Sequence, residues 1–459
     1  MLPGRLAVLP DLDRNGRLII AAKGARAFAF GLNSVGLGLF LAEVGFDGPQ
    51  VGVILAAAMA GSAGLTLVIT VWGDRLGRRR ILIAGSLLML LAVAIPAAGA
   101  QPILLALVAF TGMVSVTANE STGLVSVDQA VLPQTVPERQ VTNAFATYGV
   151  VAFGASALGA AALGPLVGLG DALGGSGPER FGPTFVAYAL VGLVSAGLAA
   201  RLDERAELGE RLEKGFAIRR SRGTVARLSA LFALDSFASG FAVQSFVAFW
   251  FATRHDLGPG TVGALFFGGS ILAALSFPAA AALANRFGLI RTMVFTHIPA
   301  NLFFVAMAVV PVGAAQVAAV LYLARSFLST MDVPARQSYV MAVVDPAERT
   351  ATAGVTSLAR SAAQSAGPLV GGALLVPLGV GVPLIAAGVL KVGYDLLLFA
   401  AFRARPAPGE LATERAAERT AERAAKRERE ATEERDGPGD EGRARRREEG
   451  PATPRDDAV

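Results

Sequence analysis

Ionisable side chains stand inside long apolar stretches of this sequence, and they are the residues best suited to chemistry. They are Arg26, Glu120, Asp235, Arg325, Asp332 and Arg360. A charge surrounded by hydrocarbon is costly, so such residues usually face a partner or a water-filled cavity. A carboxyl group in a cavity that alternates between wet and dry can load and release a proton. Glu120 ranks first as a proton carrier, Asp235 second and Asp332 third.

The depth of these charges suggests how they pair. Glu120 lies eight residues before Asp128, which places it about 12 Å deeper along a helix, at a rise of about 1.5 Å per residue. Arg26 and Asp235 lie at a similar depth in the first and seventh apolar stretches. We therefore expect them to pair with each other across two halves of the chain. The alternative for each charge is a structural ion pair.

Two further pairs of charges are related by helical spacing. Arg325 and Asp332 are seven residues apart, which puts them on one face of a helix, and Lys391 and Asp395 are spaced i,i+4. The second spacing lets opposite charges neutralise each other on one helix. Arg325 and Arg360 would also attract an organic anion.

Amide side chains in the middle of apolar stretches are candidates for substrate binding, because they donate and accept hydrogen bonds. They are Asn33, Asn119, Gln244 and Gln364. The sequence has no Cys, which excludes disulfides and thiolate metal sites. It has only two His, so we do not expect a metal centre built from histidines. It shows no nucleotide-phosphate loop and no nucleophile arrangement, so we expect no enzyme.

The elements that must position these residues are apolar helices. The chain is 53% hydrophobic and 17% charged, with a mean hydropathy of +0.53, which is typical of a polytopic α-helical membrane protein. Twelve stretches approach the roughly 20 residues that a transmembrane helix requires. They cover residues 18–44, 51–72, 81–100, 103–127, 141–165, 182–200, 228–252, 260–284, 292–312, 314–335, 350–375 and 381–402.

Arginine marks one side of the membrane. Arg-rich turns occur at 73–80, 139, 201–227, 285–291 and 345–349. The turns that alternate with them hold only Arg180 and Arg254. The positive-inside rule therefore predicts cytoplasmic termini and a cytoplasmic central loop, in a cell inner or plasma membrane. These arginines also explain the pI near 9.9, so no nucleic-acid partner is expected.

The two groups of six stretches repeat. Gly164-Pro165-Leu166-Val167-Gly168 recurs as Gly367-Pro368-Leu369-Val370-Gly371, and the turn at 73–77 recurs weakly at 284–288. Repeated halves usually place a binding site between them, near the membrane midplane. The predicted organisation is two six-helix halves, a cytoplasmic central loop and a charged tail that is expected to be disordered. The first half covers 1–200, the central loop 201–227, the second half 228–402 and the tail 403–459.

The first Arg-rich turn carries a known signature. Gly73, Asp74, Arg75, Gly77, Arg78 and Arg79 align with G-x-L-a-D-r-x-G-r-r, although the opening glycine is Thr70 and the leucine is Trp72. With this motif and the repeat, roughly residues 15–402 resemble the major facilitator superfamily, and most closely its proton-coupled drug and metabolite exporters. The resemblance implies twelve transmembrane helices in two pseudo-symmetric halves.

The resemblance also implies roles for the motif residues. In the family the signature aspartate lies against the N-terminus of span 11, so Asp74, Arg78 and Asp128 would form a latch. That latch would hold the halves together on the cytoplasmic face when the cavity opens outward. The alternative is that the arginines only set topology. Glycine–proline motifs like those of antiporters are expected to let spans 5 and 11 bend. These comprise Gly164, Pro165, Gly168, Gly367, Pro368 and Gly371.

Together these features predict a secondary active transporter that moves a small organic solute by alternating access. We expect it to act as a monomer in the lipid bilayer, with the proton gradient as its energy source and no cofactor. Efflux in exchange for protons is the first expectation. Proton-coupled uptake of a small organic metabolite, such as an anion, is the second. A transport-inactive sensor or scaffold is the third.

Overall fold

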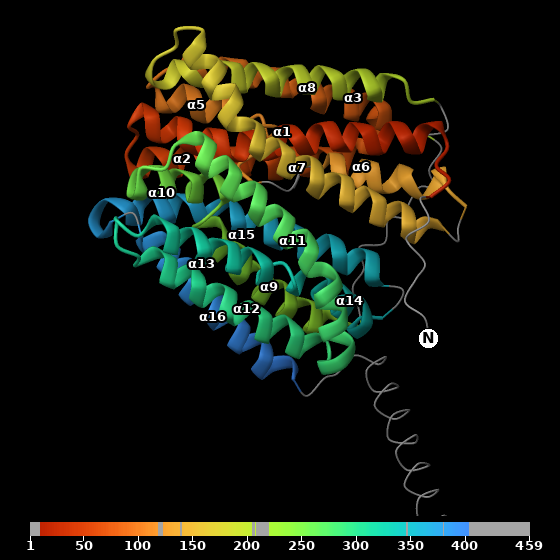
Figure 1. Cartoon of the computed structure of the whole chain (residues 1–459). Coiled ribbons are helices and arrows are strands. Elements are labelled where there is room, and N and C mark those ends of the chain that lie inside the picture. Colours follow the sequence, from red (N-terminus) through yellow and green to blue (C-terminus); the bar gives the residue numbers. More distant parts are fainter. Residues whose placement is uncertain are drawn as a thin grey trace, which may run out of the picture. The chain divides into compact units, whose positions relative to one another are not determined.

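The computed structural model describes residues 10–117, 123–137, 140–203, 207, 220–345, 348–379 and 381–403, and its regular elements there are all helical. They belong to one compact unit (Figure 1). The first eight helices are α1 (Arg14–Val44), α2 (Gly48–Leu76), α3 (Arg78–Leu88), α4 (Ala94–Ala98), α5 (Pro102–Ala109), α6 (Leu124–Val131), α7 (Val141–Ala172) and α8 (Gly182–Ala200). The other eight are α9 (Arg222–Gly240), α10 (Gln244–His255), α11 (Pro259–Phe287), α12 (Leu289–Ala308), α13 (Ala315–Leu328), α14 (Asp332–Val343), α15 (Arg349–Leu378) and α16 (Val382–Phe402).

Local sequence sets where the long helices start and stop. Asp47 forms a capping box with Gln50 at the start of α2, so two backbone N–H groups that lack helical partners are satisfied. The turns after α2 and α11 each need a glycine, because Gly77 and Gly288 have φ values of 86° and 89°. These two glycines occupy matching places in the repeated turn, so both copies keep the same backbone geometry.

Nine helical segments among the described residues are long and apolar enough to cross a membrane. Each coincides with one of the predicted stretches. The three predicted stretches that are not among the nine are 103–127, 314–335 and 350–375. The first two are interrupted in the structure, and α15 covers the third as one helix. The chain is thus an all-α polytopic membrane protein, as predicted.

The third stretch stays helical but changes to a 3-10 helix at Met89–Val93, between α3 and α4. Three other stretches that we expected to be continuous helices are broken. The fourth leaves the helix after α5, the seventh is divided between α9 and α10, and the tenth between α13 and α14. Breaks in the fourth and tenth stretches occupy corresponding places in the two copies of the repeat. Irregular backbone at membrane depth is stable only where other groups complete its hydrogen bonds or where it lines a cavity.

The break in the fourth stretch is completed by its neighbours. The Tyr188 hydroxyl donates to the carbonyl of Met113, and the Asn33 side chain donates to the carbonyl of Ser115 at 2.8 Å. The backbone N–H of Ser245, at the start of α10, donates to the carbonyl of Val116 at 3.2 Å. Helices α8, α1 and α10 therefore supply hydrogen-bond donors to carbonyls that would bond to backbone N–H groups of the same helix if the stretch were continuous.

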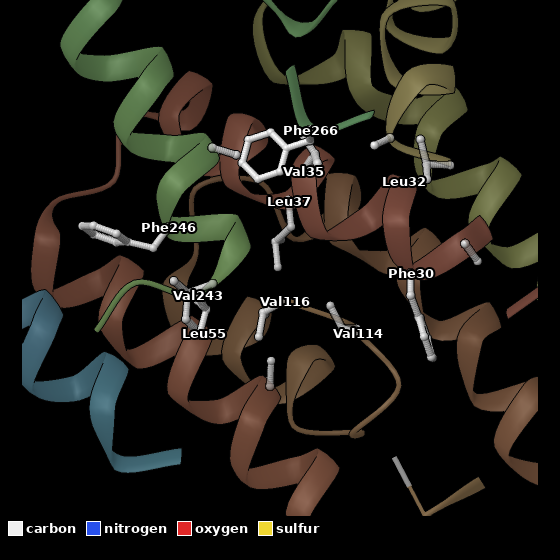
Figure 2. Close-up of a cluster of buried hydrophobic side chains, with 14 of the residues drawn as sticks. Phe30, Leu32, Val35, Leu37, Leu55, Val114, Val116, Val243, Phe246 and Phe266 are labelled. Carbon is white, nitrogen blue, oxygen red and sulfur yellow. The ribbon is translucent and has the colours of Figure 1, made fainter. Parts of the chain in front are cut away.

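Packing follows one scheme in both copies of the repeat. Helix α1 packs against α7 and α8, and α9 correspondingly packs against α15 and α16. We call α1–α8 the first half and α9–α16 the second half. The halves meet where α1 contacts α10, α2 contacts α15 and α7 contacts α11. Apolar side chains from both halves gather at this meeting point (Figure 2). They include Phe30, Val35, Leu55, Val116, Val243 and Phe266.

Candidate functional site

A cavity of about 330 Å³ lies between the halves. The first half contributes Thr117, Phe153 and Ser156 to its wall. Within the described part of the chain, the charged lining residues come from the second half. They are Asp235, Arg325, Asp332, Arg336, Arg360 and Lys391. Both interrupted stretches of the second half contribute to this wall, with Ala242 and Val243 at one break and Ser329 and Thr330 at the other.

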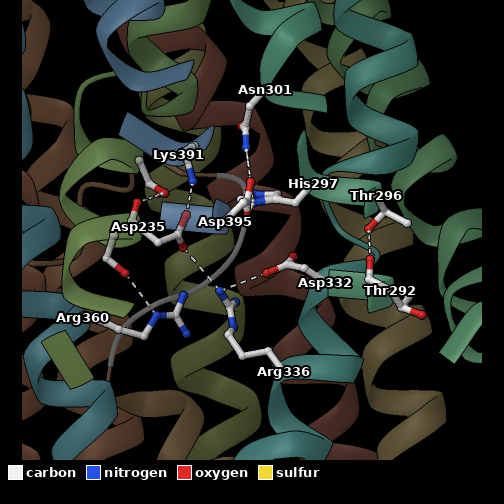
Figure 3. A network of polar contacts seen from close by, with 12 residues as sticks. Asp235, Thr292, Thr296, His297, Asn301, Asp332, Arg336, Arg360, Lys391 and Asp395 are labelled. Carbon is white, nitrogen blue, oxygen red and sulfur yellow. Dashed lines mark hydrogen bonds and ion pairs between the residues drawn. The ribbon is translucent and has the colours of Figure 1, made fainter. Parts of the chain in front are cut away.

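Asp235 is the centre of the charge network in the cavity (Figure 3). One carboxylate oxygen is 2.6 Å from Lys391 Nζ on α16, and the other is 3.4 Å from a terminal nitrogen of Arg336 on α14. Arg336 also contacts Asp332, one turn away on α14, at 3.0 Å. The prediction that Arg26 pairs with Asp235 is therefore wrong, because Asp235 finds its cations within its own half.

The predicted pairing of Lys391 with Asp395 is also replaced. Lys391 reaches Asp235 on α9, and Asp395 lies against His297 on α12, with its Oδ1 2.9 Å from Nδ1. Asn301 donates to the same carboxylate at 3.3 Å. Although the two residues are spaced i,i+4, tertiary partners offer shorter and more buried contacts than the shared helix face does.

Arg325 and Arg360 differ from the other cavity cations. Within the described residues, the structure gives neither of them a carboxylate within 4.0 Å. The Arg325 guanidinium lies 4.0 Å from the ring centroid of Phe304, and no hydrogen-bond partner of its buried Nε is found in the described ranges. Arg360 Nε donates to the Ser236 hydroxyl at 3.1 Å. The predicted shared face of Arg325 and Asp332 does not form on one helix, because the break at 329–331 separates α13 from α14. Both nevertheless reach the cavity.

The described residues of the cavity carry an excess of positive charge. Its cations are Arg325, Arg336, Arg360 and Lys391, against the carboxylates of Asp235, Asp332 and Asp395, the last of which contacts the lining residue His297. With a neutral imidazole, four cations face three carboxylates among the residues that the structure describes. An anion that entered this cavity would bring negative charge beside Arg325 and Arg360.

Arg26 and Asp128 form the corresponding charge pair of the first half. Both side chains have no exposed surface, and a terminal nitrogen of Arg26 contacts the Asp128 carboxylate. The Tyr148 hydroxyl donates to the same carboxylate at 2.9 Å. Arg26 thus stands where we had expected Arg78. A long side chain on a helix points back toward the N-terminus, which directs Arg26 along α1 toward Asp128 rather than across to α9.

The predicted substrate amides separate into two groups. Gln244 and Gln364 line the cavity. Asn33 is buried and holds the broken fourth stretch through the carbonyl of Ser115, which is a structural task. Asn119 and Glu120, the first choice for proton carrier, lie outside the described residues.

The signature turn contacts the central loop. Glu207 accepts from the backbone N–H groups of Arg78 and Arg79 at 2.7 and 3.0 Å, and the Arg79 side chain donates to the carbonyl of Ala200. Arg75 is exposed, and the side chain of Asp74 lies outside the described residues. A latch made by Asp74 and Arg78 therefore stays a prediction, while Asp128 is placed with Arg26.

The glycine–proline motifs bring helices close together. Helices α7 and α15 run on through Pro165 and Pro368. A Cβ at Gly164 would lie 2.7 Å from the Cα of Gly260, and one at Gly367 would lie 2.5 Å from the Cα of Gly240. A Cβ at Gly371 would lie 3.3 Å from Phe241, whereas Gly168 borders open space. Close helix approach, at the first two positions, is thus what these motifs provide in this conformation.

Several site residues were missed by the sequence reasoning. Arg336 lies beyond residue 335, where the tenth stretch was expected to end, but α14 continues to Val343. His297 was considered only as a metal ligand. The signal that could have found it was the presence of an imidazole and a carboxylate, Asp395, in the middle of two stretches of the same half.

Comparisons with known proteins agree with this architecture. A family model described as Major Facilitator Superfamily matches residues 20–361. An uncharacterised membrane protein of Saccharomyces cerevisiae (strain ATCC 204508 / S288c) is 24% identical over 425 residues, covering 85% of this chain and 94% of that protein.

Solved structures share the fold at low sequence identity. The nucleoside transporter NupG gives a TM-score of 0.67 at 12% identity, covering 85% of this chain and 99% of that one. A bacterial homologue of the human lysosomal transporter Spinster, in an inward-facing and occupied conformation, gives 0.63 at 17% identity over 84% and 96%. A D-xylose-proton symporter gives 0.64 at 11% identity over 84% and 97%. At these identities the likeness concerns the fold alone.

Proposed function

The chain belongs to the Major Facilitator Superfamily, and from that premise we propose that the solute it transports is a small organic anion. Alternating access of the central cavity to the two sides of the membrane would move it. Repeated-half transporters bind substrate near the midplane, between their halves, and the cavity described above is lined by residues of both halves. The protein is a transporter and not an enzyme.

The observation that carries the proposal is the pair of guanidinium groups at Arg325 and Arg360. Both line the cavity, and neither has a carboxylate partner among the described residues. An arginine in a desolvated site normally has its charge matched by a carboxylate or a phosphate. A substrate carboxylate or phosphate would complete these two sites, whereas a neutral sugar would leave them unmatched.

Close backbone contacts support an inward-facing arrangement. A Cβ at Gly38 would meet the carbonyl of Ser245, one at Gly52 would meet Gly372, and one at Gly164 would meet Gly260. These contacts all lie toward the end of the bundle that carries the α1–α2 turn. With cytoplasmic termini, as the arginine distribution predicts, this is the extracellular end. The closed side would then be outside and the accessible side inside.

We further propose that the proton gradient drives transport. Efflux by exchange was the first expectation from the sequence, with Glu120, Asp235 and Asp332 as proton carriers. Asp235 and Asp332 are held by Lys391 and Arg336, so protonating either would release a buried cation from its partner. The anionic character proposed for the substrate favours the second expectation, uptake together with protons.

Transport of three probe anions tests the proposal. Benzoate, succinate and phenyl phosphate would be presented to proteoliposomes, with D-xylose as the neutral comparison, and uptake of label would be measured. We expect saturable transport of at least one anion and none of the sugar. Arg325→Gln and Arg360→Gln should each weaken apparent affinity at least tenfold, because a charge-assisted hydrogen bond contributes about 1.5–3 kcal/mol.

The control variant is Arg180→Gln. Arg180 pairs with Asp171 at 3.2 Å in a partly exposed position outside the cavity, so its loss should leave transport unchanged. Transport of the sugar alone, or full affinity in both cavity variants, would refute an anion site. Deleting the residues after Arg405 addresses the sensor alternative, since a transporter would retain its transport activity.

A further inference from the structure

The imidazole of His297 forms a dyad with Asp395 behind the cavity. Nδ1 lies 2.9 and 3.1 Å from the two carboxylate oxygens, and Asn301 donates to Oδ2 at 3.3 Å. When Asp395 is ionised, its carboxylate accepts hydrogen bonds only, and Nδ1 then carries the proton toward Asp395. The second ring nitrogen, Nε2, is then the atom that can gain or lose a proton.

Nε2 can exchange protons with water in the cavity. His297 lines the cavity wall, and within the described residues no hydrogen-bond partner occupies its Nε2. When the Nε2 lone pair accepts a proton from a hydronium ion, the ring becomes an imidazolium and water is left behind. The Nδ1–H bond to Asp395 is unchanged in this step. Release of the proton to water reverses it.

Charged and titratable groups surround the dyad from several helices (Figure 3). The ring of Tyr394 is 6.2 Å from the imidazole, edge-on. Helix α16 also brings Lys391, α9 brings Asp235, α13 brings Tyr322 and Arg325, α14 brings Asp332 and Arg336, and α15 brings Arg360. The carboxylates among them have cations as partners, so an added charge on His297 has Asp395 as its nearest counter-ion.

We propose that His297, held by Asp395, is the proton-binding site of the transport cycle, and that the proton and the substrate anion bind together. This inference rests on the proposed anion site. A proton on His297 adds positive charge to a cavity that already holds Arg325 and Arg360, so it favours an anion there. Linkage is reciprocal, so a bound anion favours the proton to the same degree. Proton and anion therefore cross the membrane in the same direction.

The dyad is better suited to this task than the carboxylates in the cavity. Neutralising Asp235 would leave Lys391 as a buried cation without its partner at 2.6 Å, and removing one partner of a buried pair is strongly destabilising. Protonating His297 instead creates a charge beside an existing carboxylate. The cycle can then load a proton without breaking an ion pair.

Histidine NMR tests the proton site in the intact protein. The chain has only two histidines, so His255→Gln leaves His297 as the sole ring to observe. His255 contacts the carbonyl of Val312 and the ring of Trp250, away from the cavity lining. We expect reversible protonation of Nε2 as the pH of the sample is lowered, while Nδ1 stays protonated. A ring that keeps one protonation state throughout would overturn the proposal.

Transport by His297→Asn tests the coupling. The anion that wild-type protein transports, of benzoate, succinate and phenyl phosphate, is followed in two assays. We expect proton-driven accumulation to be lost, while exchange of labelled for unlabelled anion at equal pH is retained. A purely structural role would reduce both. His255→Gln should keep both.

The outcomes separate this inference from the proposed function. If wild-type protein transports none of the three anions, the proposed anion substrate fails, and the NMR titration still reports on the dyad. If His297→Asn still accumulates anion against its gradient, the dyad is not the proton site, although the anion site stands. Alkalinisation inside vesicles during anion entry would show exchange and overturn cotransport.

Discussion

Replacing one partner of the Arg26–Asp128 pair should strongly destabilise the first half. Both side chains are fully buried, and Tyr148 donates to the carboxylate at 2.9 Å. Asp128→Leu leaves a buried guanidinium without its counter-ion, and Arg26→Met leaves a buried carboxylate. Breaking such a pair costs about 3–5 kcal/mol in unfolding free energy.

The double variant Arg26→Met with Asp128→Leu should recover most of this loss. Replacing a buried ion pair with apolar residues of similar size is often close to neutral. The Tyr148 hydroxyl still loses its acceptor, and an unsatisfied buried donor costs about 1–3 kcal/mol. We therefore expect the double variant to be about 1–3 kcal/mol less stable than the wild type, well below the sum of the single variants.

Reversible unfolding of the purified protein in micelles measures these free energies. The comparison pair is Arg180 with Asp171, which is partly exposed, with side chains 29% and 50% accessible. Its cycle should give a coupling of about 0–1 kcal/mol. Losses below about 1 kcal/mol in both single variants at Arg26 and Asp128, or a double variant as unstable as their sum, would refute the reasoning.

Two further predictions concern the conformational equilibrium. Asp74→Asn should leave membrane insertion intact and shift the balance between inward- and outward-facing states, as measured by labelling single cysteines introduced into this Cys-free chain; an unchanged balance would reduce the signature to a topology signal. Gly164→Val should favour the outward-facing state, because a side chain there would collide with the backbone of Gly260, whereas Gly168→Val, which borders open space, should leave labelling unchanged.

The fold could be predicted from the sequence because a bilayer imposes a length on every apolar helix. The arginine turns and the repeated glycine–proline motif then placed those helices in two sets. The breaks in the fourth, seventh and tenth stretches could not be found this way. The donors that complete the fourth break, Tyr188, Asn33 and Ser245, come from distant parts of the chain.

The candidate site was predicted in part. Charges within apolar stretches identified Asp235, Arg325, Asp332 and Arg360, and all four line the cavity. Their partners were not predictable, because a partner depends on the rotation of each helix about its axis. Lys391 illustrates this point, since it bypasses Asp395 on its own helix and reaches Asp235 on α9.

The hydrogen bond from the Ser245 N–H to the Val116 carbonyl joins the main chain of one half to the main chain of the other. A main-chain bond does not depend on which side chain occupies either position, proline at 245 excepted. Sequence drift can therefore alter the neighbouring contact between the Ser245 hydroxyl and the Ser34 carbonyl without removing the main-chain bond. Substitutions at either position can therefore change the side-chain contacts where the halves meet while the main-chain link between the halves persists.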